Sequence, residues 1–294
     1  MASILYYAIL SGVLIGLYYS LMALGLNLVF GVTRIVNLSH GDFIMLSAYT
    51  SFWLFFYFHL SPLVGLVIVI PLFFLVGILT YFALVKKLLK SKDPEMTSFI
   101  VFFGLSFSIE SAAAITFGNS YRSLPLNFLP ISHINVFGYS MPFVNVFVAI
   151  LAVIVILFTY VYLNRTKIGL KTRAIMSNKE TAISFGINPG VIFAVSLGIG
   201  IAITAIAGVF SPYFFGAIYP SEGGIITIIA FSIIIIGSLG NPLATVIGGI
   251  VYGLIINVTG IYIPGWSYAI TFIVLVTIIL VRPNGILGGK IREV

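Results

Sequence analysis

Three polar side chains that could do chemistry stand close together in the segment GVTRIVNLSHGD, between two strongly apolar stretches. They are Asn37, His40 and Asp42. An imidazole beside a carboxylate could act as a general base, which is the chemistry of an intramembrane hydrolase. The same groups could instead cap backbone amides at a helix start, or line a wet cavity if 31–42 re-enters the membrane. We assign all three as candidate solute-path or gating residues, with the hydrolase as an alternative.

Glu110 is the one carboxylate near the middle of an apolar stretch, within SFSIESAAAITF. Lipid cannot solvate it, so it must face the interior of a helical bundle. It is predicted either to lie on a solute path or proton relay, or to join helices by hydrogen bonds. Glu222, in contrast, is expected at an external helix start, where the helix dipole accounts for it.

A glycine-rich break, GSLGNP, separates two late apolar stretches, the first of which is short. Segments of this kind mark discontinuous helices in transporters, so 224–242 is either a span with an ordinary turn or a re-entrant segment. We therefore add four residues to the candidate solute path: Gly237, Ser238, Gly240 and Asn241.

Composition shows what kind of elements must position these groups. Hydrophobic residues make up 61% of the chain and charged residues 7%, and the mean hydropathy is +1.21. Since a spanning helix needs about 20 apolar residues, we predict an all-α, polytopic transmembrane helical bundle of about eight to ten spans in one domain, 1–294. The apolar runs lie near 5–30, 42–59, 62–85, 97–117, 143–163, 190–211, 224–240, 242–261 and 266–281. The first residues carry no basic region or cleavage site and are assigned to the first span.

The basic residues indicate the orientation in the membrane. Twelve of the fourteen lysines and arginines fall in three short blocks, within 86–92, 165–179 and 282–292. By the positive-inside rule these blocks face the cytoplasm of a cell membrane, so the C-terminus lies inside and the N-terminus outside. The high pI then reflects topology and contact with membrane lipid, and no nucleic acid is expected as a partner.

The longest predicted cytoplasmic segment, 164–190, has mixed polarity. We expect one amphipathic helix over 172–185, ended by Gly186, with Pro189 preventing its continuation. Its small apolar surface suits either anionic lipid or a groove on a partner protein. Two glycine pairs with four-residue spacing, Gly12 with Gly16 and Gly249 with Gly253, are candidate helix-packing sites.

Catalytic and nucleotide motifs are missing from the sequence. It contains no HExxH, no GxSxG and no phosphate-cradling P-loop, and it has no cysteine. We therefore expect no enzymatic activity, no metal and no cofactor bound by this chain.

Four segments resemble the permease family of branched-chain amino acid ABC importers. ALGLNLVFGVTRIVNLSHGDF is similar to that family's first signature, GNSYRSLP to its external motif, and IIIIGSLGNPLATVIGG to its late glycine-rich segment. IGLKTRAIMSNKETAISFGIN resembles the ATPase-coupling loop. The coupling residues are assigned as Gly169, Arg173, Ala174, Asn178, Glu180, Ala182, Gly186 and Ile187.

The resemblance implies a permease subunit that moves leucine, isoleucine, valine or a related small solute by alternating access. It also implies several partners: a second permease, either a paralogue or a copy of this chain, two cytoplasmic ATPase subunits that hold ATP, and an extracytoplasmic solute-binding protein. The alternative is an ion- or proton-coupled secondary transporter in which Glu110 or Asp42 carries the coupling ion.

Overall fold

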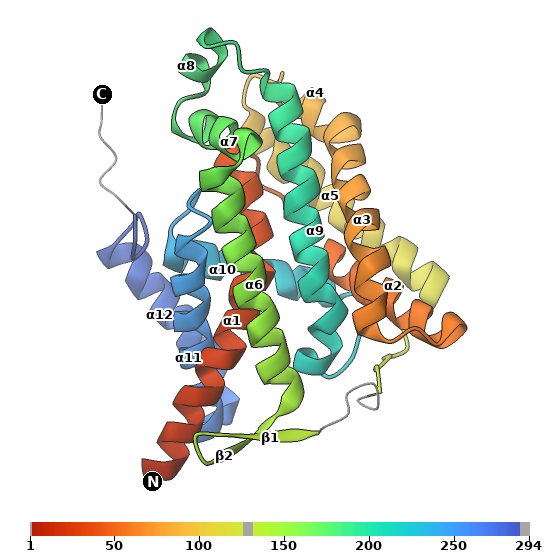
Figure 1. Cartoon of the computed structure of the whole chain (residues 1–294), viewed down its shortest axis with the longest axis vertical. Coiled ribbons are helices and arrows are strands. Elements are labelled where there is room, and N and C mark those ends of the chain that lie inside the picture. Colours follow the sequence, from red (N-terminus) through yellow and green to blue (C-terminus); the bar gives the residue numbers. More distant parts are fainter. Residues whose placement is uncertain (1, 126–131, 289–294) are drawn as a thin grey trace.

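The computed structural model describes residues 2–125 and 132–288, which form a helical bundle (Figure 1). Each of the nine predicted apolar segments is a helix, and the all-α class is confirmed. The helices are α1 (Ala2–Thr33), α2 (His40–Phe58), α3 (Pro62–Thr80), α5 (Pro94–Phe117), α6 (Phe143–Arg165), α9 (Pro189–Phe215), α10 (Glu222–Gly237), α11 (Ala244–Tyr262) and α12 (Ser267–Val281).

Shorter elements complete the chain. A π-helical turn, Tyr81–Val85, joins α3 to α4 (Lys86–Leu88), and a 3-10 turn, Pro264–Trp266, precedes α12. Helices α7 (Lys167–Ser177) and α8 (Lys179–Ser184) follow α6. Strands β1 (His133–Val136) and β2 (Tyr139–Pro142) pair as an antiparallel hairpin with His133 opposite Pro142.

Seven helical segments in the described part of the chain are long and apolar enough to cross a membrane. They begin at Ser3, Pro62, Pro94, Phe143, Pro189, Ala244 and Pro264. Of the nine predicted spans, α2 and α10 do not qualify. The first turn of α2 carries Asp42, and α10 has 16 residues, which corresponds to about 24 Å.

Helix α10 lies across the bundle and not along it (Figure 1). Its first turn packs on the start of α2, where His40 contacts the Met22 carbonyl of α1, and its last turn is bonded to Asn27. Met22 and Asn27 therefore mark the two ends of α10 on α1. They are only about 7–8 Å apart along the α1 axis, much less than the length of α10, so α10 cannot run parallel to α1. The structure therefore favours the re-entrant alternative for 224–242, and 31–42 likewise turns back into the bundle.

Close packing of α1 against α11 forms one side of the core. A Cβ on Gly16 would lie 2.7 Å from the Ile250 Cα, and one on Gly253 would overlap the Gly16 backbone. The two predicted glycine pairs thus meet each other across one seam, because only glycine allows the two backbones to approach so closely. Outside the core, α3, α5, α6 and α12 expose large apolar side chains, as expected of helices that face lipid.

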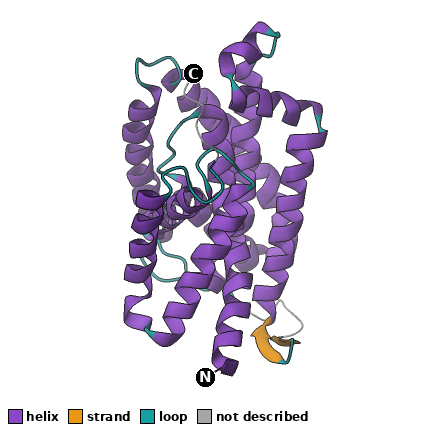
Figure 2. Cartoon of the chain, turned by 90° about the vertical axis from the view of Figure 1, so that its left-hand side faces the viewer, coloured by secondary structure: helices purple, strands orange, loops and turns teal. Residues whose placement is uncertain are grey.

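The two ends of the bundle differ in charge. The N-terminus and the hairpin lie at one end, and α4, α7 and α8 lie at the other (Figures 1 and 2). Lys86 and Lys87 are on α4, and the block from Arg165 to Lys179 runs from the end of α6 to the start of α8. Two basic blocks therefore gather at one end, as the positive-inside reasoning requires. Lys290 and Arg292 of the third block lie outside the described residues.

Candidate functional site

The first candidate group is buried where α2 begins. The Asn37 Oδ1 accepts hydrogen bonds from the Ser39 amide at 3.1 Å and from the Ser39 hydroxyl at 2.9 Å. The His40 Nε2 lies 2.9 Å from the Met22 carbonyl oxygen of α1. Among the described residues no hydrogen bond joins His40 to Asp42. The dyad that a hydrolase would need is not formed, and these side chains instead fix the entry to α2.

The starts of α2 and α10 cross in direct contact. The Gly41 amide donates to the Thr227 hydroxyl at 2.8 Å, and the one hydrogen of that hydroxyl is shared between the carbonyl oxygens of Gly223 at 3.0 Å and Leu38 at 3.1 Å. A Cβ on Gly41 would overlap the Gly223 carbonyl, and a Cβ on Gly223 would overlap the Asp42 Oδ1. Only glycine fits at both positions, so the crossing is encoded by this pair.

Three carboxylates from three helices surround the first turn of α10. Asp42 is 0% exposed and Glu222 is 2% exposed, with the Ser106 hydroxyl of α5 beside the first carboxyl group and the Tyr219 backbone beside the second. Glu110 of α5 is partly exposed, and its Oε1 faces Gly224 at 3.5 Å from an ideal Cβ. The expectation that Glu222 simply caps an external helix start is wrong, because α10 begins inside the bundle. Burying carboxyl groups is unfavourable for folding, so these three residues stay candidates for a functional role.

A second group gathers at the other end of α10 around Asn27, which is completely buried. The Asn27 Nδ2 lies 2.9 Å from the carbonyl oxygens of Ser238 and Asn241 and 2.7 Å from the Thr245 hydroxyl. Its Oδ1 accepts a 2.7 Å hydrogen bond from the Gly240 amide. Asn27 was not among the residues predicted for the site. The signal for it was a lone amide inside the apolar run ALGLNLVFG.

The predicted solute-path residues therefore form two groups, one at each end of α10. Asn37, His40, Asp42 and Glu110 meet at its start, and the predicted turn residues from Gly237 to Asn241 lie at its end. After α12 the chain returns to this turn, where the Leu287 amide donates to the Gly237 carbonyl at 3.1 Å.

The predicted coupling segment is two helices, so the expectation of a single helix over 172–185 is wrong. Asn178 ends α7, where its amide donates to the Ala174 carbonyl at 3.0 Å. It also begins α8, because its Oδ1 accepts from the Thr181 amide at 2.8 Å. An asparagine side chain competes with the helix for backbone amides and favours this N-cap position.

Helix α7 rests directly on the end of α6. The Thr166 hydroxyl caps α7 by accepting from the Gly169 amide at 2.9 Å. A Cβ on Gly169 would overlap the Tyr162 carbonyl, so glycine is required there. Ala174 packs partly against the core, while Arg173 is exposed and donates to the Asn164 Oδ1 at 2.7 Å.

Helix α8 projects beyond α7 at this end of the bundle (Figure 1). Buried Ala182 and partly buried Ile187 anchor it, and Glu180 is exposed in its first turn. Gly186 has a φ of 77°, and the Ile187 amide donates to the Ala182 carbonyl at 3.2 Å, which is a glycine-dependent helix end. The termination predicted at Gly186 is confirmed.

The side chains at the tip of α8 are apolar and face outward. Phe185 is 82% exposed and Ile183 is 46% exposed. Ile183 on α8 and Phe185 directly after it thus form a small exposed apolar surface away from the long spans.

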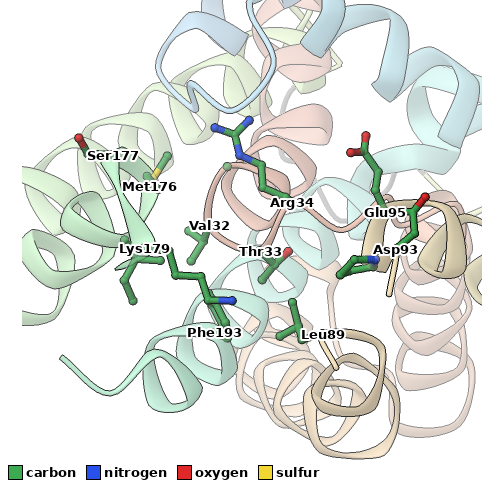
Figure 3. A pocket seen from close by; sticks show the side chains of 13 residues that line it. Val32, Thr33, Arg34, Leu89, Asp93, Glu95, Met176, Ser177, Lys179 and Phe193 are labelled. Atoms are coloured by element: carbon green, nitrogen blue, oxygen red, sulfur yellow. The ribbon is translucent and has the colours of Figure 1, made fainter. Parts of the chain in front are cut away.

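A pocket of about 420 Å³ separates the coupling segment from the end of α1 and the start of α5 (Figure 3). Met176, Ser177 and Lys179 lie on one side, Asp93 and Glu95 on the other, and Arg34 between them.

Comparisons with known proteins point to one family. A family profile described as branched-chain amino acid transport system, permease component, matches residues 8–279. LivH of Escherichia coli K12, named a high-affinity branched-chain amino acid transport system permease protein, is 25% identical over 95% of this chain and 94% of its own length. BraD of Pseudomonas aeruginosa, with the same description, is 23% identical over 95% of this chain and 94% of its own. A probable LivH of Methanocaldococcus jannaschii is 26% identical over 91% and 88%. No solved structure matches the chain.

Proposed function

The chain belongs to the family of branched-chain amino acid transport permeases, and we propose that it moves leucine, isoleucine, valine or a closely related solute as the permease subunit of an ATP-driven importer. The match over most of the chain carries this proposal. It also disfavours the ion-coupled secondary transporter, because the relatives are permease components of transport systems.

The coupling segment supports an ATPase partner. Helix α8 exposes Phe185 and Ile183 at the end of the bundle that also carries the basic residues. We propose that these apolar side chains enter a groove on a cytoplasmic ATPase subunit, which holds the ATP, while this chain binds no cofactor. The basic end then faces the cytoplasm, and the N-terminus and hairpin face outward toward the solute-binding protein.

Helix α5 supports a second permease. Its apolar window is only 17% buried within this chain, and Glu110 is partly exposed in the middle of it. A carboxylate at that depth needs a neighbour other than lipid. A second permease packed over α5 would enclose Glu110 in a solute path between the two subunits.

Site-specific cross-linking tests this arrangement, because the chain has no cysteine of its own. Ser184→Cys places a nearly isosteric thiol at the exposed end of α8, and Ser140→Cys places one on the exposed hairpin at the opposite end. With co-expressed ATPase subunits, we expect a nucleotide-sensitive cross-link from position 184 and none from position 140.

A membrane-impermeant thiol reagent applied to intact cells provides the control for orientation. It should label Ser140→Cys directly and Ser184→Cys only after the membrane is opened. Cross-linking from Ser140→Cys, or the reverse labelling pattern, would contradict the proposed orientation. A freely labelled cysteine at position 184 that never meets an ATPase would refute the coupling role.

A further inference from the structure

A pocket of about 380 Å³ lies between the end of α3 and the start of α9, at the basic end of the bundle (Figure 1). Its walls are the π-helical turn Tyr81–Val85 with Lys86 on one side and the first turns of α9 on the other. The apolar segment Pro62–Leu88 ends here, and the span Pro189–Phe215 begins here. The pocket therefore lies at the depth where membrane spans pass into the layer of lipid head groups.

Close packing one turn away explains why this pocket opens. A Cβ on Gly77 of α3 would lie 2.7 Å from the Gly198 Cα of α9, so the two backbones touch at this level. One turn further toward the basic end the same helices carry Tyr81 and Ala194, which line the pocket. The helices thus meet through glycine at one level and leave a groove at the next.

Three side chains with hydrogen-bond donors line this pocket. Tyr81 is 4% exposed, and its hydroxyl makes no hydrogen bond in the described chain, although it lies 3.1 Å from an ideal Cβ on Gly190. Asn188 caps α9, because its Oδ1 accepts from the Gly190 amide at 3.0 Å, and its Nδ2 donates to no other described residue. Lys86 is exposed, and its Nζ lies 5.8 Å from the centre of the Phe82 ring. A buried hydroxyl without a protein partner at the wall of a pocket is available to a ligand.

The π-helical turn brings the ammonium group and the hydroxyl toward the same side. In an α-helix, residues five apart are separated by about 140° around the axis. Here the Lys86 amide bonds to the carbonyl of Tyr81, five residues earlier, which brings the two side chains closer to one face. Single π turns of this kind occur frequently at functional sites.

The charges around the pocket favour an anion. Lys86 begins the basic block within 86–92, and the start of α9 adds the partial positive charge of a helix N-terminus. None of the described residues that line the pocket is acidic, since Asp93 and Glu95 line the separate pocket of Figure 3.

The remaining walls of the pocket are apolar. Phe82 and Val191, each more than half exposed, lie on its two sides and continue into the apolar surface of α3 and α9. A phospholipid needs both parts, because its phosphate requires donors and its acyl chains require apolar surface. A soluble phosphate would leave the apolar walls uncovered.

We propose that this pocket binds one anionic phospholipid from the leaflet at the basic end of the bundle. The Lys86 ammonium, the Tyr81 hydroxyl and the Asn188 side-chain amide donate to the phosphate oxygens. An acyl chain lies against Phe82 and Val191. The lipid thereby joins α3 to α9 where the coupling segment ends. This inference does not depend on which solute the permease moves.

Lipid binding by the purified chain tests the proposal without any transport measurement. The probe is dioctanoyl phosphatidylglycerol, titrated into the chain in neutral detergent micelles at physiological salt and followed by native mass spectrometry. Lys86→Gln should weaken binding about tenfold, because it removes a charge-assisted hydrogen bond. Tyr81→Phe keeps the ring and should weaken binding about threefold or more, as expected for loss of one hydrogen bond.

Lys87→Gln is the matched control on α4. Lys87 is the neighbour of Lys86, is also exposed and carries the same charge, but it does not line the pocket. Because a charge that does not contact the lipid is largely screened at physiological salt, this variant should weaken binding less than about twofold. The thermal stability of the lipid-free chain should be unchanged in all three variants, since none removes a hydrogen bond within the described chain.

Three results would overturn the lipid site. Equal weakening by Lys86→Gln and Lys87→Gln would show only a general attraction between the lipid and the basic block. Equal binding of dioctanoyl phosphatidylcholine, whose head group has no net charge, would show an apolar groove that does not recognise an anion. Displacement of the lipid by an equal concentration of inorganic phosphate would identify a site for soluble phosphate instead.

Discussion

Replacing Asn27 by alanine should destabilise the bundle more than any other single amide replacement along the α1–α11 seam. The side chain is completely buried and contacts Ser238, Gly240, Asn241 and Thr245. The amide nitrogen has two hydrogens for three acceptors, so one hydrogen is shared. Alanine leaves the turn between α10 and α11 without any of these contacts.

The expected loss of stability depends on whether each group that contacts Asn27 can form another hydrogen bond after the substitution. The carbonyl of exposed Asn241 can be hydrated, whereas Ser238 is buried and Gly240 only partly exposed. Interhelical hydrogen bonds in membranes contribute about 0.6 kcal/mol each on average, and a buried group left unsatisfied costs about 1–3 kcal/mol. The free energy of unfolding should therefore fall by about 2–4 kcal/mol in Asn27→Ala.

Asn257→Ala is the control for this prediction. Asn257 lies on α11 at the other end of the same seam, is only partly buried, and donates to the Ala8 carbonyl and the Ser11 hydroxyl. With half as many contacts, its replacement should cost about 1 kcal/mol. Equilibrium unfolding of both purified variants in mixed micelles measures the two losses. An equal or larger loss in Asn257→Ala would refute the assignment of Asn27 as the main polar anchor.

Two glycine substitutions test the backbone contacts. Gly253→Ala should lower stability by about 1–3 kcal/mol, because its Cβ would overlap the backbone of Gly16, whereas Gly260→Ala on the same helix meets nothing within 4 Å and should be neutral or stabilising. Thermal unfolding compares the pair, and similar losses would contradict the seam. Gly186→Ala should cost about 1 kcal/mol locally, because alanine is disfavoured at a φ of 77°, and it should weaken the cross-link between α8 and the ATPase. An undiminished cross-link would show that this turn does not position α8.

Local sequence signals predicted the helices well because each depends on a contiguous run of residues. The nine apolar segments, the helix end at Gly186 and the glycine pairs are of this kind. Placing α10 across the bundle depends instead on contacts far apart in the chain. Thr227 bonds to the segment before α2, and Asn27 bonds to the turn after α10. Only the shortness of the segment indicated that it does not span the bundle.

Two other predictions were wrong, each for its own reason. Asn178 falls on the polar face of the predicted amphipathic helix, so its capping of α8 was not visible in the periodicity. Glu222 was placed at an external surface because it precedes an apolar run that was assumed to cross the membrane. Once α10 begins inside the bundle, Glu222 is buried with it, and the prediction for one residue fails with the prediction for the helix.

The position of α10 gives the coupling segment a short physical route to the carboxylates. Gly31 on α1 is the meeting point, since its ideal Cβ would lie 2.7 Å from the Met176 Cε of α7 and 2.8 Å from the Gly240 carbonyl oxygen. Gly240 belongs to the turn held by Asn27, and this turn begins where α10 ends. From there a single rigid helix reaches the contact of Gly223 with Asp42. Contacts of Gly31, Gly240 and Asn27 thus link α7 to one end of α10, and α10 links that end to Asp42. If α10 ran along the bundle as a membrane span, its two ends would lie at different depths, and it would not connect the Gly240 turn to Asp42 so directly.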